Sequence, residues 1–144
     1  VAAVAPEHLF VYGSLLSGIP VTARPLEARA PFAELSGCGR LIGPASASGR
    51  LFAVAWYPGF VPGKSPGKQV RGEVWRLTHP DRLLAALDDY EGDGYVRSRI
   101  RAKLDTGARL EAFAYLLANS PGAAPRIESG DYLAWLNSPP QAPA

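Results

Sequence analysis

An alternating segment in the second half of the chain places the strongest limit on what this sequence can fold into. From Tyr95 to Leu104, small or apolar side chains occupy every second position, and the positions between them are basic: Arg97, Arg99, Arg101 and Lys103. A period of two is typical of a β-strand that turns one face to a core and the other to water. We therefore predict a strand here, with the basic residues as a solvated stripe.

This strand is expected to return on itself as a β-hairpin. Asp105–Gly107 has the composition of a turn, and Arg109–Leu117 is again rich in apolar and aromatic side chains. The Pro- and Gly-rich segment Tyr57–Lys68 is predicted to be a long loop. Four earlier segments have the composition of strands: His8–Tyr12, Gly37–Pro44, Gly49–Tyr57 and Val70–Leu77.

Short helices are expected between and after these strands. Pro25–Leu35 and Ile127–Leu136 are two candidates. A third helix begins near Thr78, which can cap it, with Pro80 in the first turn where a missing N–H costs nothing. Its apolar face has helical spacing and is formed by Leu83, Leu84 and Leu87.

Length and composition fit one α+β domain over residues 1–144. Of the 144 residues, 47% are hydrophobic and 19% are charged, which suits a single globular core. The expected strands number about six or seven and could close into a barrel. We place the core at about residues 8–118 and expect the Pro- and Ala-rich tail, residues 138–144, to be flexible.

Composition also argues against several classes of function. The net charge of +2 is too small to indicate binding to nucleic acid or to an anionic membrane, and no apolar run approaches the ~20 residues that span a bilayer. One cysteine, Cys38, and two histidines are too few for the usual metal sites, so we expect no metal. A lone cysteine and an N-terminal segment without signal-peptide features suit a cytoplasmic protein.

Glu91 is the best candidate for acid–base chemistry. It lies where the third helix is expected to end, beside Gly92, so the scaffold can hold its carboxylate at a turn. Glu91 belongs to a group of four carboxylates that would raise one another's proton affinity if buried together: Asp88, Asp89, Glu91 and Asp93. A solvated acidic helix end and a weak cation site are the alternatives. We favour Glu91 for its longer reach and its flanking glycine.

A second candidate segment follows the first strand directly. In Tyr12-Gly13-Ser14-Leu15, the glycine allows a tight turn that can expose successive N–H groups to a carboxylate or an oxyanion. The Tyr12–Leu15 segment fits neither the lysine-containing phosphate-loop pattern nor the GxSxG pattern, so neither a phosphate loop nor an activated Ser14 is predicted. An ordinary turn is the alternative.

Together these segments resemble one family, the γ-glutamylcyclotransferase-like (AIG2-like) superfamily. The resemblance runs from about Leu9 to Leu117 and depends on the order and spacing of several short segments. These are Phe10–Leu15, Gly49–Phe52 with Tyr57–Pro58, Val70–Trp75, Leu87–Gly92 with Tyr95–Arg97, and Ala112–Tyr115.

The resemblance implies a small mixed β-barrel with peripheral short helices, and a cavity between the Tyr-Gly-Ser-Leu loop and Glu91. It also implies an enzyme that converts a γ-glutamyl amine, a small-molecule substrate, to 5-oxoproline and the free amine. Carried over residue by residue, Tyr12, Gly13, Ser14 and Leu15 would bind the glutamyl group, and Glu91 would be the general acid/base. The substrate's own α-amine is the nucleophile, so the chain needs only to supply proximity and proton transfer, and the implied reaction uses neither a metal nor a cofactor.

Other residues and functions stay open at this level. Tyr115 could contact the substrate or belong to the core, and Arg97 could orient the substrate, although we favour a structural pairing with the acidic group. We expect Glu73 to be structural and paired with an arginine. The alternative function is a non-catalytic binding module of the same fold that senses a small carboxylate. The leaving amine and the oligomeric state are not predicted.

Overall fold

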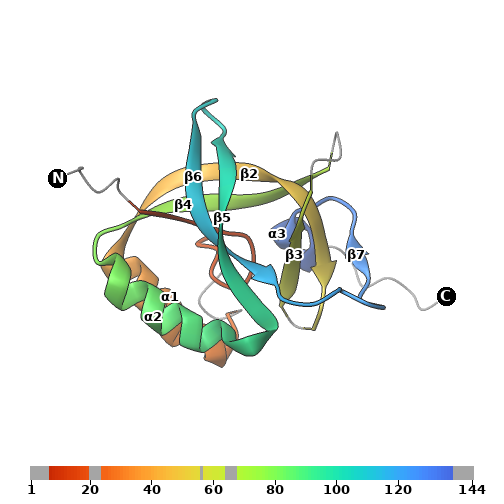
Figure 1. Ribbon diagram of the computed structural model, residues 1–144, viewed down its shortest axis with the longest axis horizontal. Coiled ribbons are helices and arrows are strands. Elements are labelled where there is room, and N and C mark those ends of the chain that lie inside the picture. The colour runs from red at the N-terminus through yellow and green to blue at the C-terminus, as the bar shows by residue number, and fades with distance from the viewer. Residues whose placement is uncertain (1–6, 20–23, 56, 64–67, 138–144) are drawn as a thin grey trace.

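Five strands close into a ring in the computed structural model, which describes residues 7–19, 24–55, 57–63 and 68–137 (Figure 1). The strands are β1 (His8–Val11), β2 (Gly39–Ala53), β4 (Gln69–Leu77), β5 (Tyr95–Leu104) and β6 (Arg109–Leu117). Their order is β2-β4-β1-β6-β5, and β5 closes the ring by pairing with β2 at Ala45–Leu104 and Ser46–Lys103. The β1–β6 pair is parallel and the others are antiparallel, so the barrel is mixed.

Two further strands and the helices surround this ring. Both β3 (Pro58–Pro62) and β7 (Arg126–Ile127) pair with the second half of β2. The helices are α1 (Leu26–Cys38), α2 (Pro80–Glu91), the 3₁₀ turn η2 (Gly92–Gly94) and α3 (Tyr132–Leu136). The predicted α+β class, with a small mixed barrel, about seven strands and short peripheral helices, is confirmed.

α2 packs against the core through its apolar face. Its apolar face, Leu83, Leu84 and Leu87, is buried as the helical spacing predicts. In Figure 1, α1 and α2 lie side by side along one side of the barrel.

The core also extends beyond residue 118, because Ile127 and Tyr132 are only 2% and 3% exposed. The tail expected to be flexible, residues 138–144, lies outside the described residues.

The prediction of two separate strands at Gly37–Pro44 and Gly49–Tyr57 is wrong. Residues 39–53 form one strand, β2, with a bulge near Leu41, and α1 occupies the residues before it. Gly49 does not interrupt β2; it allows close packing. A Cβ at that position would lie 2.4 Å from the ring of Phe60 on β3.

The loop predicted for Tyr57–Lys68 is wrong in its first part. Pro58–Pro62 forms β3, which is an edge strand, and an edge strand tolerates proline because one side needs no N–H donors. Of the remainder, residues 64–67 lie outside the described residues.

Two predictions about helices are also wrong. Thr78 does not cap α2: His79 precedes the first helical residue, and the Thr78 hydroxyl lies 3.1 Å from the His79 Nδ1 atom. The helix predicted for Ile127–Leu136 begins only at Tyr132, because Gly130 has a φ of +68° and a Cβ there would lie 2.0 Å from a backbone oxygen.

Candidate active site

A cavity of about 230 Å³ lies at the end of β1 where the Tyr-Gly-Ser-Leu loop begins. Its walls come from β1 and this loop, Tyr57 and Pro58, the end of α2, the start of β5, and Tyr115 of β6. Six of the seven predicted site residues line it: Tyr12, Gly13, Ser14, Leu15, Glu91 and Tyr115. Arg97, the seventh, is not among the lining residues.

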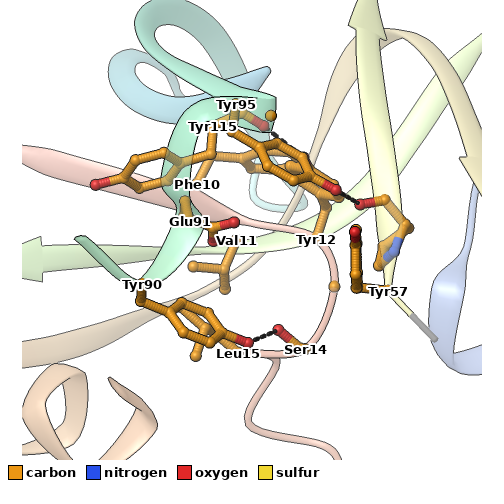
Figure 2. A pocket seen from close by; sticks show the side chains of 13 residues that line it. Phe10, Val11, Tyr12, Ser14, Leu15, Tyr57, Tyr90, Glu91, Tyr95 and Tyr115 are labelled. Carbon is orange, nitrogen blue, oxygen red and sulfur yellow. Dashed lines mark hydrogen bonds between the residues drawn. The ribbon is translucent and has the colours of Figure 1, made fainter. Parts of the chain in front are cut away.

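Glu91 differs from its acidic neighbours in exposure. It is partly buried at the last position of α2, whereas Asp88, Asp89 and Asp93 are exposed. Figure 2 shows the Glu91 carboxylate pointing into the cavity beside Val11. Burial raises the pKa of Glu91 to about 7, and the neighbouring carboxylates are not the cause of this shift. Glu91 can therefore gain or lose a proton near neutral pH.

The turn after Glu91 depends on a glycine. Gly92 has a φ of +70°, a conformation that residues with a side chain rarely adopt. Its N–H donates to the carbonyl of Asp88 as α2 ends, and the chain then enters η2 and β5. This abrupt change of direction keeps the Glu91 side chain on the cavity side of the helix end.

The opposite wall is the loop after β1, and a glycine allows its close approach to β3. A Cβ on Gly13 would lie 2.7 Å from Cγ of Pro58, so a side chain there would collide with a rigid ring. The Gly13 carbonyl accepts a hydrogen bond from the N–H of Leu16 at 3.0 Å. In the described part of the chain, the N–H groups of Ser14 and Leu15 donate to no other group. They are therefore two donors beside the cavity that pair with no described group.

Arg24 binds the backbone carbonyls of this loop, and no sequence pattern predicted this role. The side chain is 4% exposed, and its guanidinium donates to the carbonyls of Ser14, Leu16 and Ile19, the last two at 2.8 and 3.3 Å. It also lies 3.7 Å from the centroid of the Phe32 ring. Because Arg24 occupies the carbonyl side of the loop, the loop cannot easily turn those carbonyls towards the cavity.

Glu73 fixes the next residues of the loop. Its carboxylate accepts hydrogen bonds from the N–H and the hydroxyl of Ser17 at 2.6 and 2.8 Å. It also accepts one from Nε1 of Trp75 at 3.1 Å. Glu73 is therefore structural, as predicted, but its hydrogen-bond partners are Ser17 and Trp75, and the expected pairing with an arginine is not found among the described residues.

Tyrosines form much of the remaining wall. The Tyr12 hydroxyl donates to the backbone carbonyl of Tyr115, and the Tyr95 hydroxyl donates to that of Pro58 at 2.7 Å. Burial, as the main cause, raises the pKa of Tyr12, Tyr95 and Tyr115 above the ordinary value, so these hydroxyls stay neutral at physiological pH. The wall is therefore apolar, and its polar ends are already satisfied.

Arg97 lies on the other side of Tyr115, next to the acidic group. Its guanidinium lies 3.2 Å from Oδ2 of Asp88, and the Tyr115 hydroxyl donates to Oδ1 of the same carboxylate at 2.7 Å. Asp88 thus connects Arg97 to a tyrosine of the cavity wall. The pairing with the acidic group that we favoured is present, and Arg97 reaches the cavity only through these two side chains.

Other kinds of site find no support in the described residues. There, no group of three His, Cys, Asp or Glu side chains is placed to hold a metal ion. Cys38 is buried with a free thiol. Within the same ranges, the helices are too short or too polar to cross a membrane.

Comparison with known proteins gives a family and a fold. Residues 9–134 match the model of the family "Gamma-glutamyl cyclotransferase, AIG2-like". The protein c4763 from uropathogenic E. coli has a similar structure, with a TM-score of 0.67 and 22% identity over 92% of this chain and 97% of that one. For an AIG2-like protein from Mus musculus, the TM-score is 0.64 and the identity 23%, covering 85% and 86% of the two chains.

A third similar structure is longer. YkqA from Bacillus subtilis has a TM-score of 0.64 and 24% identity over 89% of this chain, which spans only 40% of the length of YkqA. No curated protein matches the sequence.

Proposed function

Since the chain belongs to the gamma-glutamyl cyclotransferase, AIG2-like family, we propose that it converts a γ-glutamyl amine to 5-oxoproline and the free amine. One observation carries the proposal. Glu91, with a pKa of about 7, lines the same cavity as the loop that offers the N–H groups of Ser14 and Leu15. The site thus combines a proton carrier with anion-binding donors, which are the two things this cyclisation needs.

In the proposed reaction, the α-amine nitrogen of the substrate attacks its own γ-carbonyl carbon. Glu91 in its carboxylate form takes a proton from the α-ammonium group and so frees the lone pair for attack. When the tetrahedral intermediate collapses, the bond from the γ-carbon to the leaving nitrogen breaks, and Glu91 returns the proton to that nitrogen. The ring nitrogen loses its second proton as it becomes the amide N–H of 5-oxoproline, and this proton balances the charge of the amine, which leaves as an ammonium ion. No water is consumed. A pKa near neutral suits Glu91 to both transfers.

The loop would supply binding and charge stabilisation. The free N–H groups of Ser14 and Leu15 can hold either the α-carboxylate of the glutamyl group or the oxyanion that develops on the γ-carbonyl. Gly13 lets this backbone come close to Pro58 and the bound substrate. The Ser14 hydroxyl hydrogen-bonds to that of Tyr90 at 2.9 Å, so we give Ser14 no role as a nucleophile.

The dimensions of the cavity favour intramolecular attack. A volume of about 230 Å³ between apolar tyrosine walls has room for a bent glutamyl group. Confinement of this kind holds the α-amine close to the γ-carbonyl, so no enzyme nucleophile is needed. This proximity can lower the activation barrier by several kcal/mol. The leaving amine would extend out of the cavity past Glu91. In this scheme Tyr115 contributes to the wall, and Arg97 supports it through Asp88.

The direct test is release of 5-oxoproline from a panel of γ-glutamyl amines that includes amino acid, amine and isopeptide conjugates. Wild-type protein should release it from at least one member, and Glu91→Gln should reduce the rate by 10²-fold or more. Asp89→Asn is the matched control, because it changes an exposed carboxylate of the same group and should leave turnover intact. Undiminished turnover by Glu91→Gln would overturn the mechanism.

If no member of the panel is turned over, the alternative of a carboxylate-sensing module gains weight. Saturable calorimetric binding of 5-oxoproline or glutamate without turnover would then support that module. We favour the enzyme because an anionic ligand gains nothing from a carboxylate beside it, whereas a proton-transfer step needs one.

A further inference from the structure

A second hollow lies on the outer surface of the barrel, away from the cavity of Glu91, and shares no lining residue with it. We call it the basic hollow. Its volume is about 820 Å³, and no aspartate or glutamate lines it. The side chains that define it are Arg99, Arg101, Lys103, Arg109, Ser46 and Ser48. The basic stripe predicted from the alternation of β5 is therefore one wall of a concave surface.

Most of the positive charge of the basic hollow is not neutralised. Arg99 pairs with Glu7 at 3.4 Å and lies 4.5 Å from the Phe113 ring centroid. Arg101, Lys103 and Arg109 make no ion pair with any residue that the structure describes, although Glu111 is the cross-strand partner of Arg101 on β6. More than half of the chain's 13 acidic residues lie on α1, α2 and η2. The helices are therefore acidic, whereas β5 carries four basic residues and no acidic one.

The backbone beside the basic hollow also has unused hydrogen-bonding capacity. β5 pairs with β6 along one side, but on its other side it pairs with β2 only at Lys103 and Leu104. From residue 95 to 102 that second side has no strand partner among the described residues. Such an edge presents N–H and C=O groups to an added strand.

Charge and backbone together point to one kind of ligand. Alternate side chains of a strand repeat at about 6.6–7 Å, which is the spacing of the basic residues on β5. An extended peptide with an acidic residue at every second position would match this spacing while pairing with the free edge. No aromatic ring lines the hollow, so the base stacking that single-stranded nucleic acid needs is missing.

We infer that the basic hollow docks an extended acidic segment of a protein partner, which adds as a strand to the free edge of β5. The inference does not depend on the proposed cyclotransferase reaction. A competing explanation is that the charges only keep the edge from pairing with other copies of the chain. The two explanations differ in whether an acidic strand binds at this place.

The test measures binding of a fluorescein-labelled ten-residue peptide, with glutamate and threonine alternating, by fluorescence anisotropy in about 50 mM salt. The informative variant is Arg99→Gln/Arg101→Gln, whose two exposed residues line the hollow on the part of β5 that has no strand partner on its second side. Its matched control is Arg40→Gln/Arg76→Gln, which removes the same charge from exposed cross-strand partners outside the hollow. Circular dichroism checks that both variants are folded.

We expect wild-type protein and the control to bind the peptide within about twofold of each other, and the hollow variant to bind about tenfold more weakly. N-methylation of alternate peptide nitrogens should also weaken binding, because it removes the donors of an added strand. Absence of binding to wild type, or equal loss in both variants, would overturn the inference. So would a thymidine oligonucleotide that binds the hollow more tightly than the peptide does.

Discussion

Ser14 and Tyr90, which are 76 positions apart in the chain, share a 2.9 Å hydrogen bond between their hydroxyl groups (Figure 2). Ser14 belongs to the loop that offers free N–H groups, and Tyr90 immediately precedes Glu91. This bond is a direct link between the two halves of the candidate site. It helps to fix the distance between the N–H groups of the loop and the carboxylate of Glu91.

Breaking this bond should therefore weaken substrate binding more than it changes proton transfer. We expect Tyr90→Phe and Ser14→Ala each to raise KM about 3- to 10-fold, the cost of one hydrogen bond of about 1 kcal/mol. The double variant should be no worse than either single one, because both remove the same interaction. Additive losses in steady-state kinetics would mean that the two hydroxyls act separately.

The pH dependence of catalysis should follow the titration of Glu91. Its pKa of about 7 means that the carboxylate form, which accepts the proton, is lost as the pH falls below neutrality. We expect kcat/KM to rise about tenfold per pH unit up to about pH 7 and then to level off. A profile of kcat/KM from pH 5 to 9 that is flat across neutrality would exclude Glu91 as the base.

The same shift should appear in stability. A carboxyl whose pKa is higher in the folded than in the unfolded state favours folding at low pH, and this contribution is lost as the pH rises from about 4.5 through about 7. Glu91→Gln, which cannot ionise, should escape the loss. Relative to wild type, its free energy of unfolding should improve by on the order of 3 kcal/mol between pH 4 and pH 8. Urea denaturation at both pH values measures the difference, and a constant offset would contradict it.

Arg24 should control the shape of the loop. Arg24→Ala leaves three carbonyls without their donor and should cost about 3 kcal/mol of stability, with a rise in KM of about tenfold. Arg24→Lys keeps the charge but cannot reach all three carbonyls, so it should recover only part of both losses. If Arg24 only positions the loop, its variants should leave the pKa of about 7 in the pH profile of kcat/KM unchanged. Arg82→Ala, at an exposed position, is the control, and an unchanged KM in Arg24→Ala would refute the role.

Periodicity predicted the parts of the fold that have one exposed and one buried face. The hairpin of β5 and β6 and the apolar face of α2 are of this kind. β2 was predicted as two strands, Gly37–Pro44 and Gly49–Tyr57, and β3 was missed because the Pro- and Gly-rich segment Tyr57–Lys68 was interpreted as a loop. In the folded chain, Gly49 leaves room for Phe60, and Pro58 begins an edge strand. These roles depend on which strands become neighbours in the fold, and the local sequence does not show this.

The candidate site was predictable where it is carried by short motifs. Glu91 and the Tyr-Gly-Ser-Leu loop were both identified, although the cause of the Glu91 shift is burial and not the neighbouring carboxylates. Arg24 could not be identified in the same way. Its importance comes from the direction of three backbone carbonyls and from the Phe32 ring, and none of these has a pattern in the sequence.

Because β1 pairs in parallel with β6, the wall of the cavity is complete only after β6 has been synthesised and has joined β1. Leu9 is aligned with Phe113, and the Tyr12 hydroxyl reaches the carbonyl of Tyr115 across 103 positions of sequence. During synthesis, the loop that follows β1 would leave the ribosome long before the strand that completes its wall. A nascent chain that stops before β6 would therefore carry both Glu91 and the loop, yet lack a closed site to hold a substrate.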